Sequence, residues 1–142
     1  SKNFKNINIV AYKKIESYSH VIHLVSKIEG EGLLAKVDAL QILADSFPAG
    51  TLSGAPKPKA MQIIKETETT NRGFYGGCVG FLGFDGSLNT AIMIRTILSK
   101  NNRLQFRAGA GITIASVPEK ELEEINLKIN ALRKAIKMAE TL

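Results

Sequence analysis

The chain has 142 residues, of which 44% are hydrophobic and 23% are charged, which is typical of one globular domain and not of a disordered or collagen-like chain. It contains no apolar stretch approaching the roughly 18 residues that a membrane-spanning helix needs, and its polar start lacks the apolar segment of a signal peptide. We therefore expect a cytoplasmic protein, with residues 1–142 forming one unit without an internal linker. The single cysteine, Cys78, excludes an intramolecular disulfide and a cysteine-based zinc site.

The 19 lysine and arginine residues outnumber the 13 acidic residues and leave a net charge of +6. This excess suits a nucleic acid, a membrane surface or a small polyanionic ligand. The basic residues are scattered among acidic and apolar neighbours, and no ladder of aromatic residues accompanies them. We therefore expect no nucleic-acid partner.

Hydrophobic periodicity predicts a strand and two helices in the first half of the chain. Residues 18–28 alternate as a strand does. Apolar residues recur at helical spacing from Val37 to Phe47, and Pro48 ends that helix. A second helix is expected to open at Pro56 and to fade within the polar residues 66–71.

The second half is predicted to contain antiparallel strands. Residues 76–84 form a glycine-rich strand, and Asp85-Gly86 is a hairpin turn that leads into a strand over 88–98. A turn at 100–102 is expected to return the chain as a strand over 104–108.

The strands end with residues 112–115, and a long helix follows to the C-terminus. Ser116 and Glu119 have the spacing of a capping box around Pro118, and apolar residues then mark one helical face. Three helices and five or six strands, paired as meanders, place the fold in the α+β class.

Two histidines are candidates for chemistry. His20 and His23 have an odd spacing, which sends them to opposite faces of a regular strand, so we do not expect them to share a metal. His23 lies between Val21 and Val25 on its face. It is either a half-buried, hydrogen-bonded core residue or a group that transfers a proton, for which its pKa is suited.

A lone arginine stands in the aliphatic segment 92–98. Arg95 is expected in a strand that is buried on both faces, where its guanidinium needs an anionic partner. That partner is either an internal carboxylate or the carboxylate or phosphate of a ligand.

Two glycine-rich segments are able to present backbone N–H groups to an anion. Residues 50–57 precede the helix at Pro56, although their spacing is not that of a P-loop. Gly109 and Gly111 allow close approach of a ligand, or mark a bulge.

Three charged residues share one stripe of the last helix. Glu121, Glu124 and Lys128 are spaced at i, i+3 and i+7. Two adjacent carboxylates suit magnesium, whereas the alternative is a solvated flank carrying a Glu124–Lys128 pair.

Six stretches, taken together and in order, resemble the C-terminal catalytic part of the chorismate-utilising enzymes, and among them the large subunit of anthranilate synthase. They are YSHVIHLVS (18–26), AGTLSGAPKPKAMQII (49–64), RGFYGGCVGF (72–81), NTAIMIRT (89–96), AGAGI (108–112) and SVPEKELEE (116–124). The resemblance covers about residues 18–140. It implies a layered sandwich of two antiparallel sheets flanked by helices.

The resemblance also implies a role for each candidate residue. His23 matches a histidine that assists proton transfer at the chorismate ring, and Glu121 with Glu124 matches glutamates associated with Mg²⁺. The remaining residues match substrate contacts: Thr51, Tyr75, Arg95, Gly109, Gly111 and Lys128. Of these, Lys128 matches a lysine that lies near the magnesium glutamates.

The implied reaction adds ammonia to chorismate with loss of a ring hydroxyl and then eliminates pyruvate, giving anthranilate for tryptophan biosynthesis. The ammonia comes from glutamine through an amidotransferase partner subunit. The family's catalytic subunit is about three times longer. We therefore expect this chain to be part of a longer protein, inactive alone and able to form homo-oligomers through uncovered surfaces.

Some residues depart from the family pattern, and two other functions stay open. Asn89 and Ala115 stand where aspartates are usual, and Ile125 and Leu127 replace polar residues beside Lys128. The alternatives are a sister activity, aminodeoxychorismate or isochorismate synthase, and a non-catalytic anion-binding domain.

Overall fold

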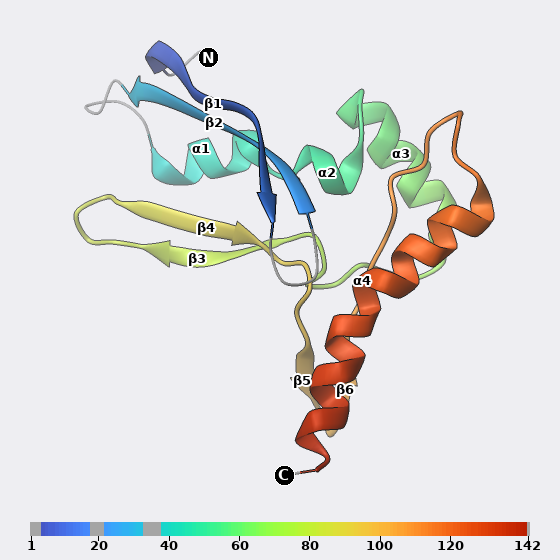
Figure 1. Ribbon diagram of the computed structural model, residues 1–142. Coiled ribbons are helices and arrows are strands. Elements are labelled where there is room, and N and C mark those ends of the chain that lie inside the picture. The colour runs from blue at the N-terminus through green and yellow to red at the C-terminus, as the bar shows by residue number, and fades with distance from the viewer. Residues whose placement is uncertain (1–3, 18–21, 33–37, 142) are drawn as a thin grey trace. The chain divides into compact units, whose positions relative to one another are not determined.

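A computed structural model describes residues 4–17, 22–32 and 38–141 (Figure 1). The chain divides into two compact units, residues 1–42 and 43–142, each of which is described by itself. Within the described residues, helices and antiparallel two-stranded sheets are both present, which confirms the α+β class.

The first unit is a long antiparallel ribbon of β1 (Phe4–Ser17) and β2 (Ile22–Gly32). The sequence analysis did not predict β1. Its register against β2 shifts at three places, and Asn6 and Lys13, with φ values of 49°, lie at two of them. These irregularities interrupt the alternation by which a strand is recognised.

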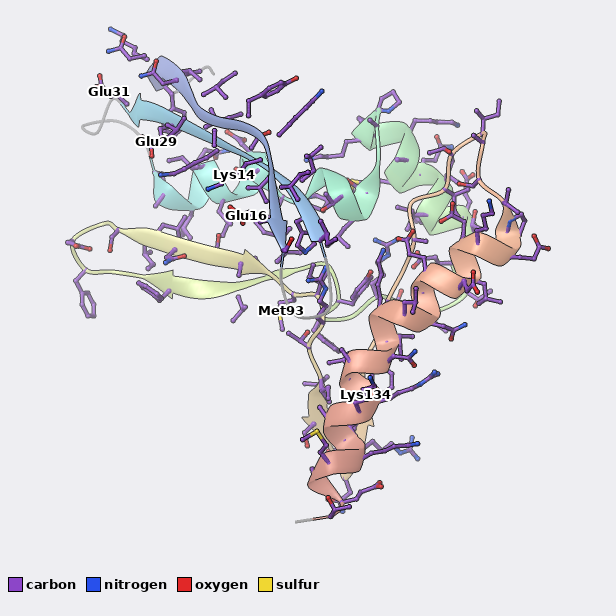
Figure 2. The ribbon with its side chains drawn as sticks, in the orientation of Figure 1. Lys14, Glu16, Glu29, Glu31, Met93 and Lys134 are labelled. Atoms are coloured by element: carbon purple, nitrogen blue, oxygen red, sulfur yellow. The ribbon has the colours of Figure 1, made fainter. Side chains whose placement is uncertain are left out.

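The strand expected over 18–28 is confirmed from Ile22 onward as β2, which continues to Gly32. Residues 18–21, including His20, lie outside the described residues. A hydrogen bond of 2.7 Å from Asn6 Nδ2 to Glu31 Oε2 links the strands near the end of the ribbon where Figure 2 labels Glu31.

Three helices follow along the chain. The first expected helix is present as α1 (Ala39–Ser46), and the second is present as α3 (Lys57–Thr67), with Pro56 at its N-cap. Between them lies α2 (Gly50–Ser53), a single turn that the sequence analysis missed because four residues are too few to show a helical period.

The predicted glycine-rich hairpin is confirmed. β3 (Cys78–Leu82) pairs antiparallel with β4 (Leu88–Ile92). Gly86 has φ 82°, and the Asp85 carboxylate accepts hydrogen bonds from the backbone N–H and the hydroxyl of Ser87 at 3.0 and 2.7 Å. Gly80 is required in β3, because a Cβ there would lie 2.1 Å from the carbonyl oxygen of Asn89.

The single strand expected over 88–98 is wrong. β4 ends at Ile92, and a new strand, β5 (Leu98–Lys100), begins after a break. Met93, labelled in Figure 2, still pairs by its backbone with Gly76 and Gly77. Arg95 then adopts φ 53°, a left-handed conformation outside the extended range of a regular strand.

The predicted turn at 100–102 is confirmed. β5 pairs with β6 (Arg103–Gln105), and Asn101 and Asn102 have φ values of 53° and 57°, as a two-residue hairpin turn requires. The strand expected over 104–108 is shorter, ending at Gln105. The strand expected over 112–115 is wrong, because these residues have no ladder partner and end in a turn.

The long C-terminal helix is confirmed as α4 (Pro118–Ala139), but its predicted capping box is wrong. Val117 is the N-cap residue and makes no side-chain cap. The Ser116 hydroxyl instead accepts a hydrogen bond of 3.0 Å from the backbone N–H of Thr113, closing a turn before the helix. Glu119 and Glu121 in the first turn complement the helix dipole.

The described residues include no fully buried side chain. Large apolar side chains stay exposed on the ribbon of β1 and β2, on the β3–β4 hairpin and on α4, which is the surface expected of two-stranded sheets without a covering layer. The antiparallel pairing that we expected is present, in three separate two-stranded sheets. Among the described helices, none has the length and apolar character needed to cross a membrane.

Candidate functional site

A pocket of about 370 Å³ opens between the helices and the turn that follows α3 in the second unit. One wall is apolar and includes Leu52, Met61 and Ile64. The other wall is polar and includes Glu68 and Arg72. Of the nine candidate site residues that the sequence predicts, Tyr75 is among the residues that line this pocket.

The Glu68–Arg72 pair forms the centre of the polar wall. Arg72 donates from Nε to both carboxylate oxygens of Glu68, at 3.1 and 3.0 Å, and from Nη2 to Oε1 at 2.6 Å. Both side chains are less than one-third exposed, with exposed fractions of 28% for Arg72 and 31% for Glu68. The hydrogen bonds from Arg72 hold the pKa of the Glu68 carboxyl below its ordinary value, and the same bonds raise the pKa of Arg72.

A second arginine approaches the same carboxylate from a distant part of the chain. Arg107 Nη2 lies 3.7 Å from Glu68 Oε2 and donates a hydrogen bond of 2.8 Å to the hydroxyl of Thr70. Glu68 therefore joins the end of α3 to the segment that precedes Gly109.

Tyr75 connects the pocket with the glycine-rich segment. The guanidinium carbon of Arg72 lies 5.9 Å from the centre of the Tyr75 ring. At the other end of the ring, the Tyr75 hydroxyl is so near Gly109 that a Cβ on this glycine would lie 3.3 Å from it. Glycine at position 109 permits this approach.

Lys128 joins α4 to the same glycine. Its Nζ donates a hydrogen bond of 3.0 Å to the Gly109 carbonyl oxygen and forms an ion pair with the Glu124 carboxylate. Tyr75, Gly109, Glu124 and Lys128 thus come together from three separate segments of the chain. Four of the nine candidate residues predicted from the sequence form one cluster.

The other five candidates are His23, Thr51, Arg95, Gly111 and Glu121. His23 is half-buried in β2, opposite Glu16, and belongs to the first unit. Thr51 is exposed in α2, next to Leu52 of the pocket wall. Gly111 is exposed and Glu121 is half-buried in the first turn of α4.

The expected environment of Arg95 is corrected by the structure. We expected a strand buried on both faces, whereas Arg95 is exposed and lies in the break between β4 and β5. The left-handed backbone at this residue is incompatible with one continuous strand from β4 to β5, so its aliphatic neighbours do not enclose the guanidinium as such a strand would.

The acidic residues of α4 offer two of the oxygen donors that a magnesium site would need. Glu121 and Glu124 are one turn apart and offer the hard oxygen donors that Mg²⁺ prefers. Within the described ranges, no group of three histidine, cysteine or acidic side chains is placed to hold a metal, and Lys128 already contacts Glu124. Two carboxylates fit two positions of a six-oxygen shell and do not complete it.

Glu68, Arg72 and Arg107 were not predicted from the sequence as site residues. The i, i+4 spacing of Glu68 and Arg72 was a usable signal for their pairing. The contact with Arg107 spans 39 positions and had no local signal. From the sequence, residues 66–71 are only the polar end of a helix, and nothing in them indicates that Glu68, one of two acidic residues there, contacts two arginines.

Comparison with known sequences identifies the family to which the chain is similar. Residues 2–134 match the family described as chorismate binding enzyme. The chain is 50% identical over 135 residues to anthranilate synthase component 1 of Aquifex aeolicus, an alignment covering 95% of this chain and 27% of that protein. The chain spans about a quarter of the length of the curated relatives it matches.

Two solved structures share the fold. Anthranilate synthase component I from Streptococcus pneumoniae aligns with a TM-score of 0.81 and 40% identity, over 86% of this chain and 28% of that one. A Bacillus anthracis structure described as a 2,3-dihydroxybenzoate-specific isochorismate synthase aligns with a TM-score of 0.88 over 96% of this chain and 36% of that one. At 24% identity, the second match speaks for the fold alone.

Proposed function

Because this chain belongs to the chorismate binding enzyme family, we propose that it forms the chorismate-binding part of an anthranilate synthase. The observation that carries this proposal is the convergence of Tyr75, Gly109, Glu124 and Lys128 from three segments. The 50% identity to a protein named anthranilate synthase component 1 favours this activity over its sister activities.

The substrate in this proposal is a dicarboxylate, and the residues supply matching donors. The Tyr75 hydroxyl and the backbone N–H groups of Gly109 and Gly111 bind one carboxylate. Arg95 binds a carboxylate through its planar guanidinium, for which its exposed position leaves access. Thr51 contributes a hydroxyl from α2, next to the pocket wall.

The proposed reaction joins the nitrogen of ammonia to the chorismate ring as a ring hydroxyl leaves as water. The enolpyruvyl side chain then leaves as pyruvate while the ring loses a proton and becomes aromatic. Chorismate and ammonia thereby give anthranilate, pyruvate and water. His23 moves a proton at the ring, because an imidazole nitrogen is able both to accept and to donate a proton.

Glu121 and Glu124 are proposed as two of the ligands of a Mg²⁺ ion, with the remaining oxygens supplied by residues outside this chain. The ion supplies positive charge that holds a substrate carboxylate. Lys128 lies beside these glutamates and limits the negative charge that they present when the ion is absent.

The same proposal includes a longer protein and a partner. In it, residues 1–142 are the C-terminal catalytic part of the protein, whose other segments cover the exposed apolar side chains and complete a layered sandwich of antiparallel sheets. The partner is an amidotransferase subunit that releases ammonia from glutamine, and the location is cytoplasmic.

Product analysis tests this proposal. The full-length protein is supplied with chorismate, ammonium and Mg²⁺, and the products are separated by chromatography. We expect anthranilate and pyruvate in equal amounts. Isochorismate or aminodeoxychorismate as the product would assign a sister activity, and unreacted chorismate would favour a binding domain without catalysis.

A further inference from the structure

Arg72 contacts three parts of the second unit at once. Its Nε and Nη2 grip the Glu68 carboxylate, its Nη1 donates a hydrogen bond of 2.6 Å to the Leu52 carbonyl oxygen, and its guanidinium lies near the Tyr75 ring. No role in binding or catalysis follows for it from the proposed function. We propose that Arg72 is a positioning residue that holds α2 and Tyr75 in the arrangement that chorismate binding requires.

The contact with Arg72 gives the Leu52 carbonyl oxygen a hydrogen-bond donor. The Leu52 carbonyl lies in the last turn of α2, and the residue four positions later is Pro56, which has no N–H to donate. A helix end leaves such carbonyls without partners inside the helix. Arg72 supplies the missing donor, and thereby fixes the backbone next to Thr51.

The planar guanidinium explains why one side chain performs both tasks. With Nε and Nη2 engaged by Glu68, Nη1 has a fixed direction, and this direction leads to Leu52. Glu68 is itself held by Arg107, which also binds Thr70. The orientation of Arg72 is therefore set from two sides before any substrate arrives.

The network of Glu68, Arg72 and Arg107 reaches three segments of this unit that carry proposed substrate contacts. Leu52 follows Thr51, Arg72 contacts Tyr75, and Arg107 precedes Gly109 by two residues. A change at Arg72 is therefore expected to alter substrate binding although Arg72 itself does not touch substrate. This inference rests on the proposed function for its kinetic consequence and on the contacts alone for its structural one.

Arg72→Lys in the full-length protein tests the inference. A lysine ammonium cannot keep the two-pronged contact with Glu68 and reach Leu52 at the same time. Hydrogen exchange measured by mass spectrometry is expected to show about tenfold less protection in the peptide over residues 49–54, since one charge-assisted hydrogen bond is lost. Protection of the β5–β6 hairpin is expected to stay unchanged.

The kinetic arm of the test measures KM and kcat for chorismate. Arg72→Lys is expected to raise KM about fivefold or more. Glu68→Gln keeps the size of the side chain and weakens the pairing, so it is expected to have the same effects to a smaller extent. Arg103→Lys, at an exposed arginine of β6, is the matched control and is expected to leave exchange and kinetics unchanged.

Three results separate the possible failures. Unchanged protection over 49–54 with an unchanged KM would overturn the positioning role. Protection lost equally in all peptides would overturn it in favour of a general stabilising role. A wild-type protein that consumes no chorismate would contradict the proposed function, while the exchange of residues 49–54 would still decide whether Arg72 holds α2.

Discussion

Lys128 donates a hydrogen bond of 3.0 Å to the carbonyl oxygen of Gly109, a residue 19 positions earlier in the chain. The same ammonium contacts Glu124 one turn before it on α4. A residue that the sequence suggested as a substrate contact thus also tethers the glycine-rich segment to the last helix. The carbonyl of Gly109 is therefore held by a side chain of α4.

The tether predicts a measurable loss of stability in Lys128→Met. Methionine keeps the aliphatic stem and removes the charged donor, and we expect the full-length protein to lose about 1 kcal/mol in free energy of unfolding. Urea unfolding followed by circular dichroism measures this change. Lys134→Met is the control, because Lys134 (labelled in Figure 2) is an exposed lysine of the same helix. An equal effect of both substitutions would contradict the tether.

A second prediction concerns the close approach of Tyr75 to Gly109. Gly109→Ala places a Cβ 3.3 Å from the Tyr75 hydroxyl, so that the ring must shift by a few tenths of an ångström. We expect the ring resonances of Tyr75 to move in the NMR spectrum and KM for chorismate to rise several-fold.

The matched substitution is Gly111→Ala, where a Cβ would meet nothing within 4 Å. It is expected to leave the Tyr75 ring resonances in place. If Gly109→Ala also left them in place, the approach of the two residues would be refuted.

Local signals allowed the sequence to predict the hairpins and the long helices. Asp85-Gly86 and the paired asparagines at 101 and 102 favour tight turns by their own chemistry, and the structure confirms both. The strand β1 was missed because bulges at Asn6 and Lys13 shift its alternation. The break at Arg95 was missed because the aliphatic residues on both sides of it indicate a continuous strand.

The candidate site was only partly accessible from sequence. Glu124 and Lys128 are one helical turn apart, and the sequence offered their pairing as the alternative to a magnesium site. The contact of Lys128 with Gly109, and that of Glu68 with Arg107, depend on how distant segments pack, and no local pattern encodes them. The roles of His23, Thr51 and Gly111 stay predictions.

The contacts of Glu68 with Arg72 and Arg107 predict that the stability of the folded protein depends on pH. The pKa of Glu68 is lowered in the folded protein by its hydrogen bonds with Arg72, below the ordinary value of 4.5. The carboxylate therefore contributes stability that is fully present above that value and is lost as the pH falls through the lowered pKa. We expect thermal unfolding between pH 6 and about pH 3 to show a smaller loss of Tm in Glu68→Gln than in wild type. Parallel curves for the two proteins would contradict this expectation.

Substitution of Arg95 is expected to change stability and substrate binding in opposite directions. Its φ of 53° is strained for a side chain with a Cβ, and glycine adopts it freely, so Arg95→Gly is expected to raise the free energy of unfolding by up to about 1 kcal/mol. The same substitution removes the proposed carboxylate contact and is expected to raise KM for chorismate at least about tenfold.

Arg95→Lys serves as the companion variant, because it keeps the charge and the strain. It is expected to raise KM without the gain in stability. An unchanged KM in both variants would remove Arg95 from the substrate site.

The position of bound chorismate tests the central claim most directly. A crystal structure of the full-length protein with chorismate, prepared without ammonia, provides this measurement. The account predicts a substrate carboxylate within hydrogen-bonding distance of the Tyr75 hydroxyl and of the backbone N–H groups of Gly109 and Gly111. Chorismate bound elsewhere, with Tyr75, Gly109 and Lys128 still in mutual contact and no ligand beside them, would contradict it.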